Sequence, residues 1–102
     1  MTVNARFDEV IHPSTRLSIV ALLAAADWAD FAFLRDRLEL SDSALSKQLS
    51  TLEDAVYVTL ERTLTGGRRR VRVQLTGVGR RAFDGHVRAL HDMLGATATP
   101  VR

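Results

Sequence analysis

The residues best suited to bind a ligand are short polar side chains on one side of a predicted helix. Residues 41–55 place Leu45, Leu49 and Leu52 at the i, i+4, i+7 spacing of a buried helical face. The other side carries hydroxyls, an amide, an ammonium and a methyl group, and no carboxylate lies between residues 43 and 52. Such groups contact the base edges and phosphates of DNA. The predicted contact face consists of Ser43, Ala44, Ser46, Lys47, Gln48, Ser50 and Thr51.

Two kinds of contact are predicted within this face. The first turns are predicted to enter the major groove with Ser43, Ala44, Lys47 and Gln48. There Gln48 could pair bidentately with adenine, Lys47 could donate to guanine, and Ala44 could touch a thymine methyl group. Ser46, Ser50 and Thr51 are predicted phosphate contacts. Taken alone, the helix is equally compatible with an ordinary solvated amphipathic helix.

A cluster of arginines follows at a glycine-containing turn. Seven of the 14 basic residues lie between Arg62 and Arg81, where no acidic residue occurs. Guanidinium groups on a predicted hairpin tip over residues 66–70 could follow a phosphate backbone or enter a narrow minor groove. The alternative is a solvated loop that carries no function. The three arginines at the tip are Arg68, Arg69 and Arg70.

The sequence lacks the residue sets of common catalytic sites. It contains no Ser/His/Asp or Cys/His set and no glycine-rich phosphate loop after a strand. Cysteine is absent, which excludes disulfides and thiolate metal sites and is neutral to mildly favourable for a reducing cytoplasm. The longest apolar run, residues 19–26, is far shorter than a membrane span. We expect a cytoplasmic protein without enzymatic activity, cofactor or membrane attachment.

Length and composition predict one folded domain. With 102 residues and 46% hydrophobic residues, the chain is long enough for a modest core and too short for a second ligand-binding domain. We place this domain at residues 1–102, with flexible ends at 1–4 and 96–102. The helical spacing of apolar residues predicts helices over residues 5–11, 14–26, 31–38 and 41–55. Residues 27–30 are predicted to be a short connector between the second and third of these helices.

The apolar period changes from 3.6 to 2 after Ala55. Alternating residues predict one strand over 56–61 and another over 71–75, which form a β-hairpin. Thr76 can cap a last helix that extends to about Leu94 and is stopped by Gly95. The predicted fold is mainly α with a β-hairpin.

Three helices, a hairpin and a closing helix in this order resemble the winged helix-turn-helix transcription regulators, and most closely their small MarR/ArsR-related group. The resemblance covers residues 7–94 and is carried by HPSTRLSIVALL, DFAFLRDRLELSDSALSKQLSTLEDA, YVTLERTLTGGRRRVRVQLT and TGVGRRAFDGHVRAL. It implies that the hairpin is a wing beside a recognition helix. One position departs from the family pattern, because Val56 stands where members usually have glycine. A β-branched residue adopts positive φ only at a cost, so either the helix continues differently into the strand, or the site is strained and stability falls.

The resemblance also implies a homodimer on a palindromic operator. The candidate dimer surface is a row at the spacing i, i+4, i+7, i+11 on the last helix, with part of the N-terminal segment closing over it. The alternative is that this row packs on the chain's own first helix. The predicted interface residues are Phe7, Val10, Ile11, Phe83, Val87, Leu90 and Leu94.

The sequence also raises the questions of whether its histidines bind a metal and what Arg16 contacts. Some relatives bind zinc across the last helices, and the segment Asp84-Gly85-His86 resembles part of such a site. The full ligand set is missing, so we predict no metal and place His12, His86 and His91 at the surface or interface. Arg16 resembles an arginine that family members carry early in the first long helix, where it could pair with an acid or contact DNA.

Three functions are compatible with these features. The first is a homodimeric, sequence-specific DNA-binding regulator, most often a repressor in this family. The second is a winged-helix module that binds a protein partner and no DNA. The third is a sensor with a small-molecule effector or metal at the dimer interface. The acid-free helix face and the arginine-rich tip favour double-stranded DNA as the partner.

Overall fold

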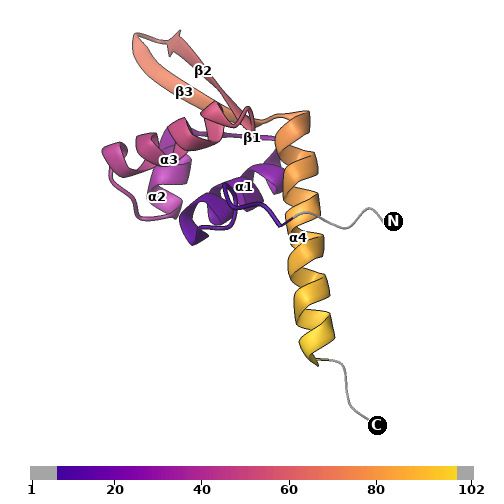
Figure 1. The fold of residues 1–102 in the computed structure, drawn as a ribbon. Coiled ribbons are helices and arrows are strands. Elements are labelled where there is room, and N and C mark those ends of the chain that lie inside the picture. Colours follow the sequence, from indigo (N-terminus) through magenta and orange to yellow (C-terminus); the bar gives the residue numbers. More distant parts are fainter. Residues whose placement is uncertain (1–6, 99–102) are drawn as a thin grey trace.

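The computed structural model describes residues 7–98. Its elements follow the predicted order of three helices, a hairpin and a closing helix (Figure 1). The bounds are α1 Ser14–Ala26, β1 Trp28–Asp30, α2 Phe31–Arg37, α3 Asp42–Asp54, β2 Val58–Thr65, β3 Arg68–Leu75 and α4 Gly77–Ala98.

The core lies where α1, α2 and α3 meet the sheet. Leu23 of α1, Leu34 of α2 and Leu49 of α3 are almost completely buried. Val58 of β2 and Val73 of β3 join them from the sheet. Since the buried residues of α3 repeat every three or four positions, packing them into this core turns the polar side of α3 outward.

The sheet has three antiparallel strands in the order β1-β3-β2. Ala29 of β1 pairs with Val73 of β3 on one side, and Leu60 of β2 pairs with it on the other. The hairpin closes at Gly66 and Gly67, whose φ angles of 57° and 77° are those of a two-residue turn of type I′. This tight turn lets β2 and β3 pair up to the tip, so both are longer than predicted. Residues Trp28–Asp30, predicted as part of a connector, instead form β1.

Residues 7–12 form a turn, and the predicted helix over 5–11 is wrong for them. The Asp8 side chain accepts hydrogen bonds from the backbone N–H groups of Val10 and Ile11, at 2.9 and 3.0 Å. The turn buries Ile11 completely. Residues 1–6, which include the predicted flexible end at 1–4, lie outside the described residues, as do residues 99–102. Gly95 does not stop α4, which continues to Ala98.

Both α2 and α3 end on a residue with positive φ that is not glycine. These residues are Glu39, with φ of 55°, and Val56, with φ of 65°. After each helix the next N–H group bonds back to a carbonyl five positions earlier: Leu40 to Arg35, and Tyr57 to Leu52, both at 2.9 Å. This is the Schellman arrangement, which normally favours glycine at the left-handed position. Val56 therefore adopts the conformation of the expected glycine, and the helix-to-wing connection is kept at the expense of local strain.

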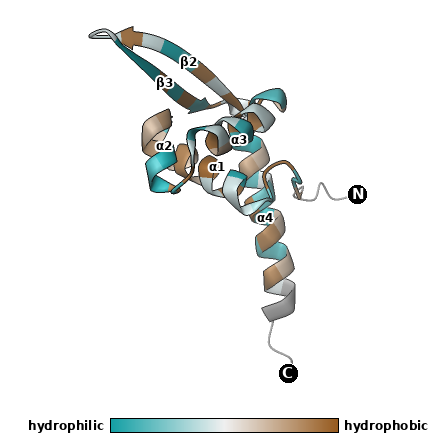
Figure 2. Ribbon diagram, turned by 90° about the vertical axis from the view of Figure 1, so that its left-hand side faces the viewer, coloured by the Kyte–Doolittle hydropathy of each residue, from teal (hydrophilic) through white to brown (hydrophobic). Residues whose placement is uncertain are grey.

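The N-terminal half of α4 packs against the body, and its C-terminal half projects beyond the other helices (Figures 1 and 2). Thr76 caps this helix, since its Oγ1 accepts a hydrogen bond from Gly79 N–H at 2.9 Å. A Cβ atom at Gly79 would lie 2.2 Å from the Tyr57 carbonyl oxygen, so only glycine lets α4 approach this closely. None of the described helices is both long and apolar enough to cross a membrane.

Candidate nucleic-acid interface

The helix α3 is held by its buried leucines and presents most of the predicted contact face to solvent. Its N-terminus is capped as predicted, because Ser41 Oγ accepts a hydrogen bond from Ala44 N–H at 3.1 Å. Four of the seven predicted contact residues are exposed, namely Ser43, Ser46, Lys47 and Ser50. The other three, Ala44, Gln48 and Thr51, are half-buried.

The hairpin lies beside α3, and the two line common hollows. One hollow is bordered by Asp42 at the start of α3 and by Arg69 and Arg70 of β3. A second is bordered by Ser46 and Ser50 of α3 together with residues of the hairpin. All residues from Glu61 to Arg70 are exposed, so the hairpin tip stands free of the body. The structure thus places the two predicted contact surfaces next to each other.

Two carboxylates that border the first hollow, those of Asp30 and Asp42, are paired with arginines. Arg35 lies 2.9 Å from both Asp36 and Asp42, and these two carboxylates raise the pKa of Arg35 above its ordinary value, with Asp36 the stronger cause. Arg70 lies 3.7 Å from Asp30. Pairing reduces the negative charge next to α3, while Arg68 and Arg69 extend exposed toward solvent.

Gln48 makes an intramolecular contact that the sequence did not reveal. Its amide oxygen accepts a hydrogen bond from Arg16 Nη1 of α1 at 2.8 Å. Arg16 also donates through Nε to the Val10 carbonyl oxygen. Arg16 therefore pairs with an amide and a backbone carbonyl, rather than with the acidic residue that the sequence suggested as one possibility.

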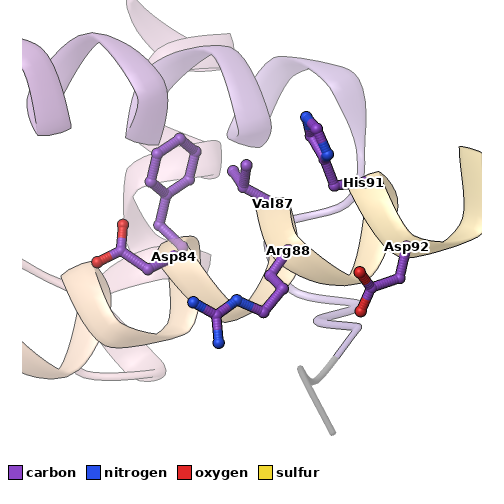
Figure 3. Close-up of a pocket in the computed structure, with 6 residues that line it drawn as sticks. Asp84, Val87, Arg88, His91 and Asp92 are labelled. Atoms are coloured by element: carbon purple, nitrogen blue, oxygen red, sulfur yellow. The ribbon is translucent and has the colours of Figure 1, made fainter. Parts of the chain in front are cut away.

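The predicted dimer surface on α4 is only partly exposed. Phe83 and Leu90 are half-buried, and Phe83 packs against the core of its own chain. Val87 is 38% exposed and Leu94 is 67% exposed. Figure 3 shows Val87 and His91 pointing to one side of α4, and Asp84, Arg88 and Asp92 to the other.

Among the N-terminal residues predicted for this surface, Ile11 is fully buried in its own core and is not available to a partner. Val10 packs partly buried against the same core, and Phe7 remains 41% exposed. The physical reason is the turn held by Asp8, which directs Ile11 inward.

A polar cluster around the buried His86, here called the histidine junction, consists of Asp8, His12, Tyr57 and His86. Asp8 and Tyr57 are half-buried, and His12 is exposed. His86 is completely buried, which corrects its predicted place at the surface or interface. The Asp8 N–H donates to His86 Nδ1 at 2.9 Å, so Nδ1 carries no proton, and Nε2 of the neutral ring donates to His12 Nδ1 at 3.3 Å. Tyr57 donates its hydroxyl proton to the Asp8 carboxylate. Burial lowers the pKa of His86, nearby His12 lowers it further, and Asp8 opposes this shift.

Comparison with known proteins identifies the family to which this chain belongs. Residues 15–94 match the family described as winged helix DNA-binding domain, and the chain belongs to this family. The hairpin is accordingly the wing and α3 the recognition helix. The uncharacterized protein MJ0432 of Methanocaldococcus jannaschii is 28% identical over 79 residues, which are 78% of this chain and 86% of that protein.

Solved structures share the fold. The transcriptional regulator homologue from Pyrococcus horikoshii OT3 aligns with a TM-score of 0.85 at 20% identity, covering 89% of this chain and 90% of that one. The heme sensor protein PefR from Streptococcus agalactiae aligns with a TM-score of 0.74 at 15% identity, covering 92% of this chain and 65% of that one. The fold of a winged helix regulator, predicted from the sequence, is confirmed.

Proposed function

We propose that the protein is a homodimeric, sequence-specific regulator of transcription that acts in the cytoplasm as a repressor, by occupying a promoter. It would belong with the small MarR/ArsR-related regulators. One observation carries the proposal: Ser46 and Ser50 on the exposed side of α3 share a hollow with Arg62 of the wing. Arg69 and Arg70 border a second hollow, and Asp42 at the start of α3 lines both, so a single DNA duplex could touch α3 and the wing. Phosphate contacts would supply most of the affinity and base contacts the choice of sequence.

Roles follow from exposure and chemistry. On α3, Lys47 would donate to a guanine and Ala44 would touch a thymine methyl group, with Ser43 beside them in the major groove. The hydroxyls of Ser46, Ser50 and Thr51 would bind phosphates. At the wing, the backbone or minor groove would be contacted by Arg68, Arg69 and Arg70.

The projecting part of α4 supports the homodimer. Met93 and Leu94 in the C-terminal half of α4 are exposed apolar residues, and Val87 at the middle of the helix is 38% exposed. A second copy placed there would shield them and would set two recognition helices on neighbouring half-sites of a palindrome.

Selection of bound sequences from a random duplex pool tests the proposal. We expect enrichment of a palindrome with half-sites about one helical turn apart, ~10 base pairs. Recovery of no preferred sequence would contradict sequence-specific regulation.

The wing is tested with Arg69→Ala. This variant should weaken binding to every duplex and reduce the slope of log Kd against log salt concentration by about one unit, because one phosphate contact is lost. Arg88→Ala, which removes the same charge from α4, should leave the slope unchanged. An unchanged slope for Arg69→Ala would remove this residue from the interface.

A further inference from the structure

Arg16 links the first helix to the recognition helix. It lies in the first turn of α1, half-buried, and its Nη1 donates to the amide oxygen of Gln48 in the middle of α3 at 2.8 Å. A second polar tie, between Arg35 and Asp42 at the start of α3, is exposed to solvent. Because the Arg16 bond is partly buried, water screens it less than the exposed pair, and it constrains the orientation of α3 more strongly.

The position of Gln48 on α3 suits a bond to α1. Gln48 follows Leu45 by three residues and precedes Leu52 by four, so it borders the buried row of the helix. Lys47 and Ser43 instead lie on the exposed side. A side chain on this border points toward the neighbouring helix α1 more directly than toward the base edges in a DNA major groove.

The chemistry of the bond also fixes the direction of the amide. A guanidinium group only donates hydrogen bonds, so the atom of Gln48 that faces Arg16 is the oxygen. A bidentate contact with adenine needs this same oxygen to accept from the adenine N6 amino group. The intramolecular bond and the adenine contact therefore use the same atom, and in the structure this oxygen is directed toward Arg16 of α1.

A second hydrogen bond fixes the Arg16 side chain on the side away from Gln48. Its Nε donates to the Val10 carbonyl oxygen, and Val10 N–H donates to the Asp8 side chain at 2.9 Å. Asp8 in turn binds Tyr57 and His86 in the histidine junction. The guanidinium group is thus bonded on two sides, which fixes its direction toward α3.

We propose that Arg16 is a positioning residue, which sets the orientation of the recognition helix through Gln48, and that Gln48 serves DNA binding by this bridge rather than by reading a base. The inference rests on the proposed function, because it concerns how the same helix reaches DNA. It replaces the adenine contact predicted for Gln48 from the sequence.

A double-mutant cycle tests the bridge. Arg16→Ala, Gln48→Leu and the double variant are compared with the wild type for Kd on the selected site and on an unrelated duplex, with thermal unfolding measured in parallel. We expect each single variant to bind the selected site about tenfold more weakly, and the unrelated duplex within about twofold of wild type. The double variant should match the single ones, because both remove the same interaction. Additive losses would overturn the bridge.

Two further measurements separate positioning from direct contact. Gln48→Glu keeps the bridge as an ion pair but has no N–H donor, so the ratio of specific to unrelated binding should stay within about threefold of wild type. A loss as large as in Gln48→Leu would mean that Gln48 reads a base. The salt slope of Arg16→Ala should equal that of wild type, whereas a decrease of about one unit would mean that Arg16 binds a phosphate.

The outcomes also distinguish this inference from the proposed function. If wild type selects no DNA sequence, the proposed function fails and the inference fails with it. If wild type selects a site and the folded variants retain full specificity, only the inference fails. Should Arg16→Ala not fold, the pair Gln48→Leu and Gln48→Glu still decides between bridge and base contact.

Discussion

The wing and the histidine junction use polar side chains in opposite ways. Every residue from Glu61 to Arg70 is exposed, and the tip arginines Arg68 and Arg69 extend toward solvent. In the junction, His86 is fully buried, and its two ring nitrogens bond to Asp8 and His12. Polar groups at the wing therefore remain available to an external anion, whereas those of the junction are committed to the fold.

This difference separates binding from stability. Exposed charges contribute little to folding, so wing variants should change DNA affinity and leave unfolding almost unchanged. A buried group that loses its partner is costly, so junction variants should change unfolding first. Four predictions test this separation, beginning with the largest expected effect.

Gly79→Ala should reduce the free energy of unfolding by ~3 kcal/mol, because the added Cβ would lie 2.2 Å from the Tyr57 carbonyl oxygen and force α4 away from the junction. Denaturant unfolding measures this. Gly77→Ala is the matched control, since its Cβ would meet only the flexible end of Arg81 at 3.5 Å. Equal stability of the two variants would show that the close approach of α4 is unimportant.

Asp8→Ala should lower the free energy of unfolding by about 2 kcal/mol, because two backbone N–H groups and the Tyr57 hydroxyl lose their acceptor. Chemical denaturation of the neighbouring Glu9→Ala variant, which changes an exposed carboxylate, provides the control. A loss no larger than in the control would mean that the junction does not hold residues 7–12.

Val56→Gly should increase the free energy of unfolding by about 1 kcal/mol, since glycine adopts the φ of 65° without the strain of a β-branched side chain. Val56→Ala keeps a Cβ and should gain less. A destabilised glycine variant would argue that the Val56 side chain contributes more by packing than it loses by strain. This prediction sharpens the comparison, because the variant removes strain from the connection between α3 and the wing and leaves the side chains of the wing and of the junction unchanged.

Acidification should destabilise the junction and leave the wing unaffected. The folded-state pKa of His86 is lowered from its ordinary value of 6.5, so below that value the unfolded chain binds a proton that the folded chain resists. The free energy of unfolding should therefore fall as the pH decreases from 7.5 to 5.5. His86→Gln, whose amide can accept from Asp8 and donate to His12, should flatten this dependence. His91→Gln, on the exposed side of α4, should retain it, and a flat wild-type profile would contradict the prediction.

The sequence predicted the helices and the hairpin because their apolar residues repeat with a clear period. Leu45, Leu49 and Leu52 determine which side of α3 is buried, and Gly66 with Gly67 determines where the hairpin turns. The strand β1 was not predicted, because a segment of three residues is too short to show an alternating pattern of apolar residues. Its pairing with β3 also joins chain segments more than 40 residues apart.

The candidate site was less predictable than the fold. Exposed polar residues such as Ser43 and Lys47 follow from helical spacing alone. The contact between Arg16 and Gln48 joins residues 32 positions apart, and nothing in their local sequence announces it. The burial of His86 was not predictable either, because its partner Asp8 lies 78 positions away. The turn that brings Asp8 to His86 was predicted as a helix from its apolar spacing.

A tryptophan at the base of the wing gives the protein an intrinsic fluorescent probe. Trp28 is the single tryptophan of the chain, and the Arg72 guanidinium carbon lies 3.8 Å from the centre of its ring. Trp28 belongs to β1 and Arg72 to β3, so a shift of the wing changes the surroundings of the indole. Intrinsic fluorescence can thus follow wing movement during a titration with nucleic acid, without an attached dye.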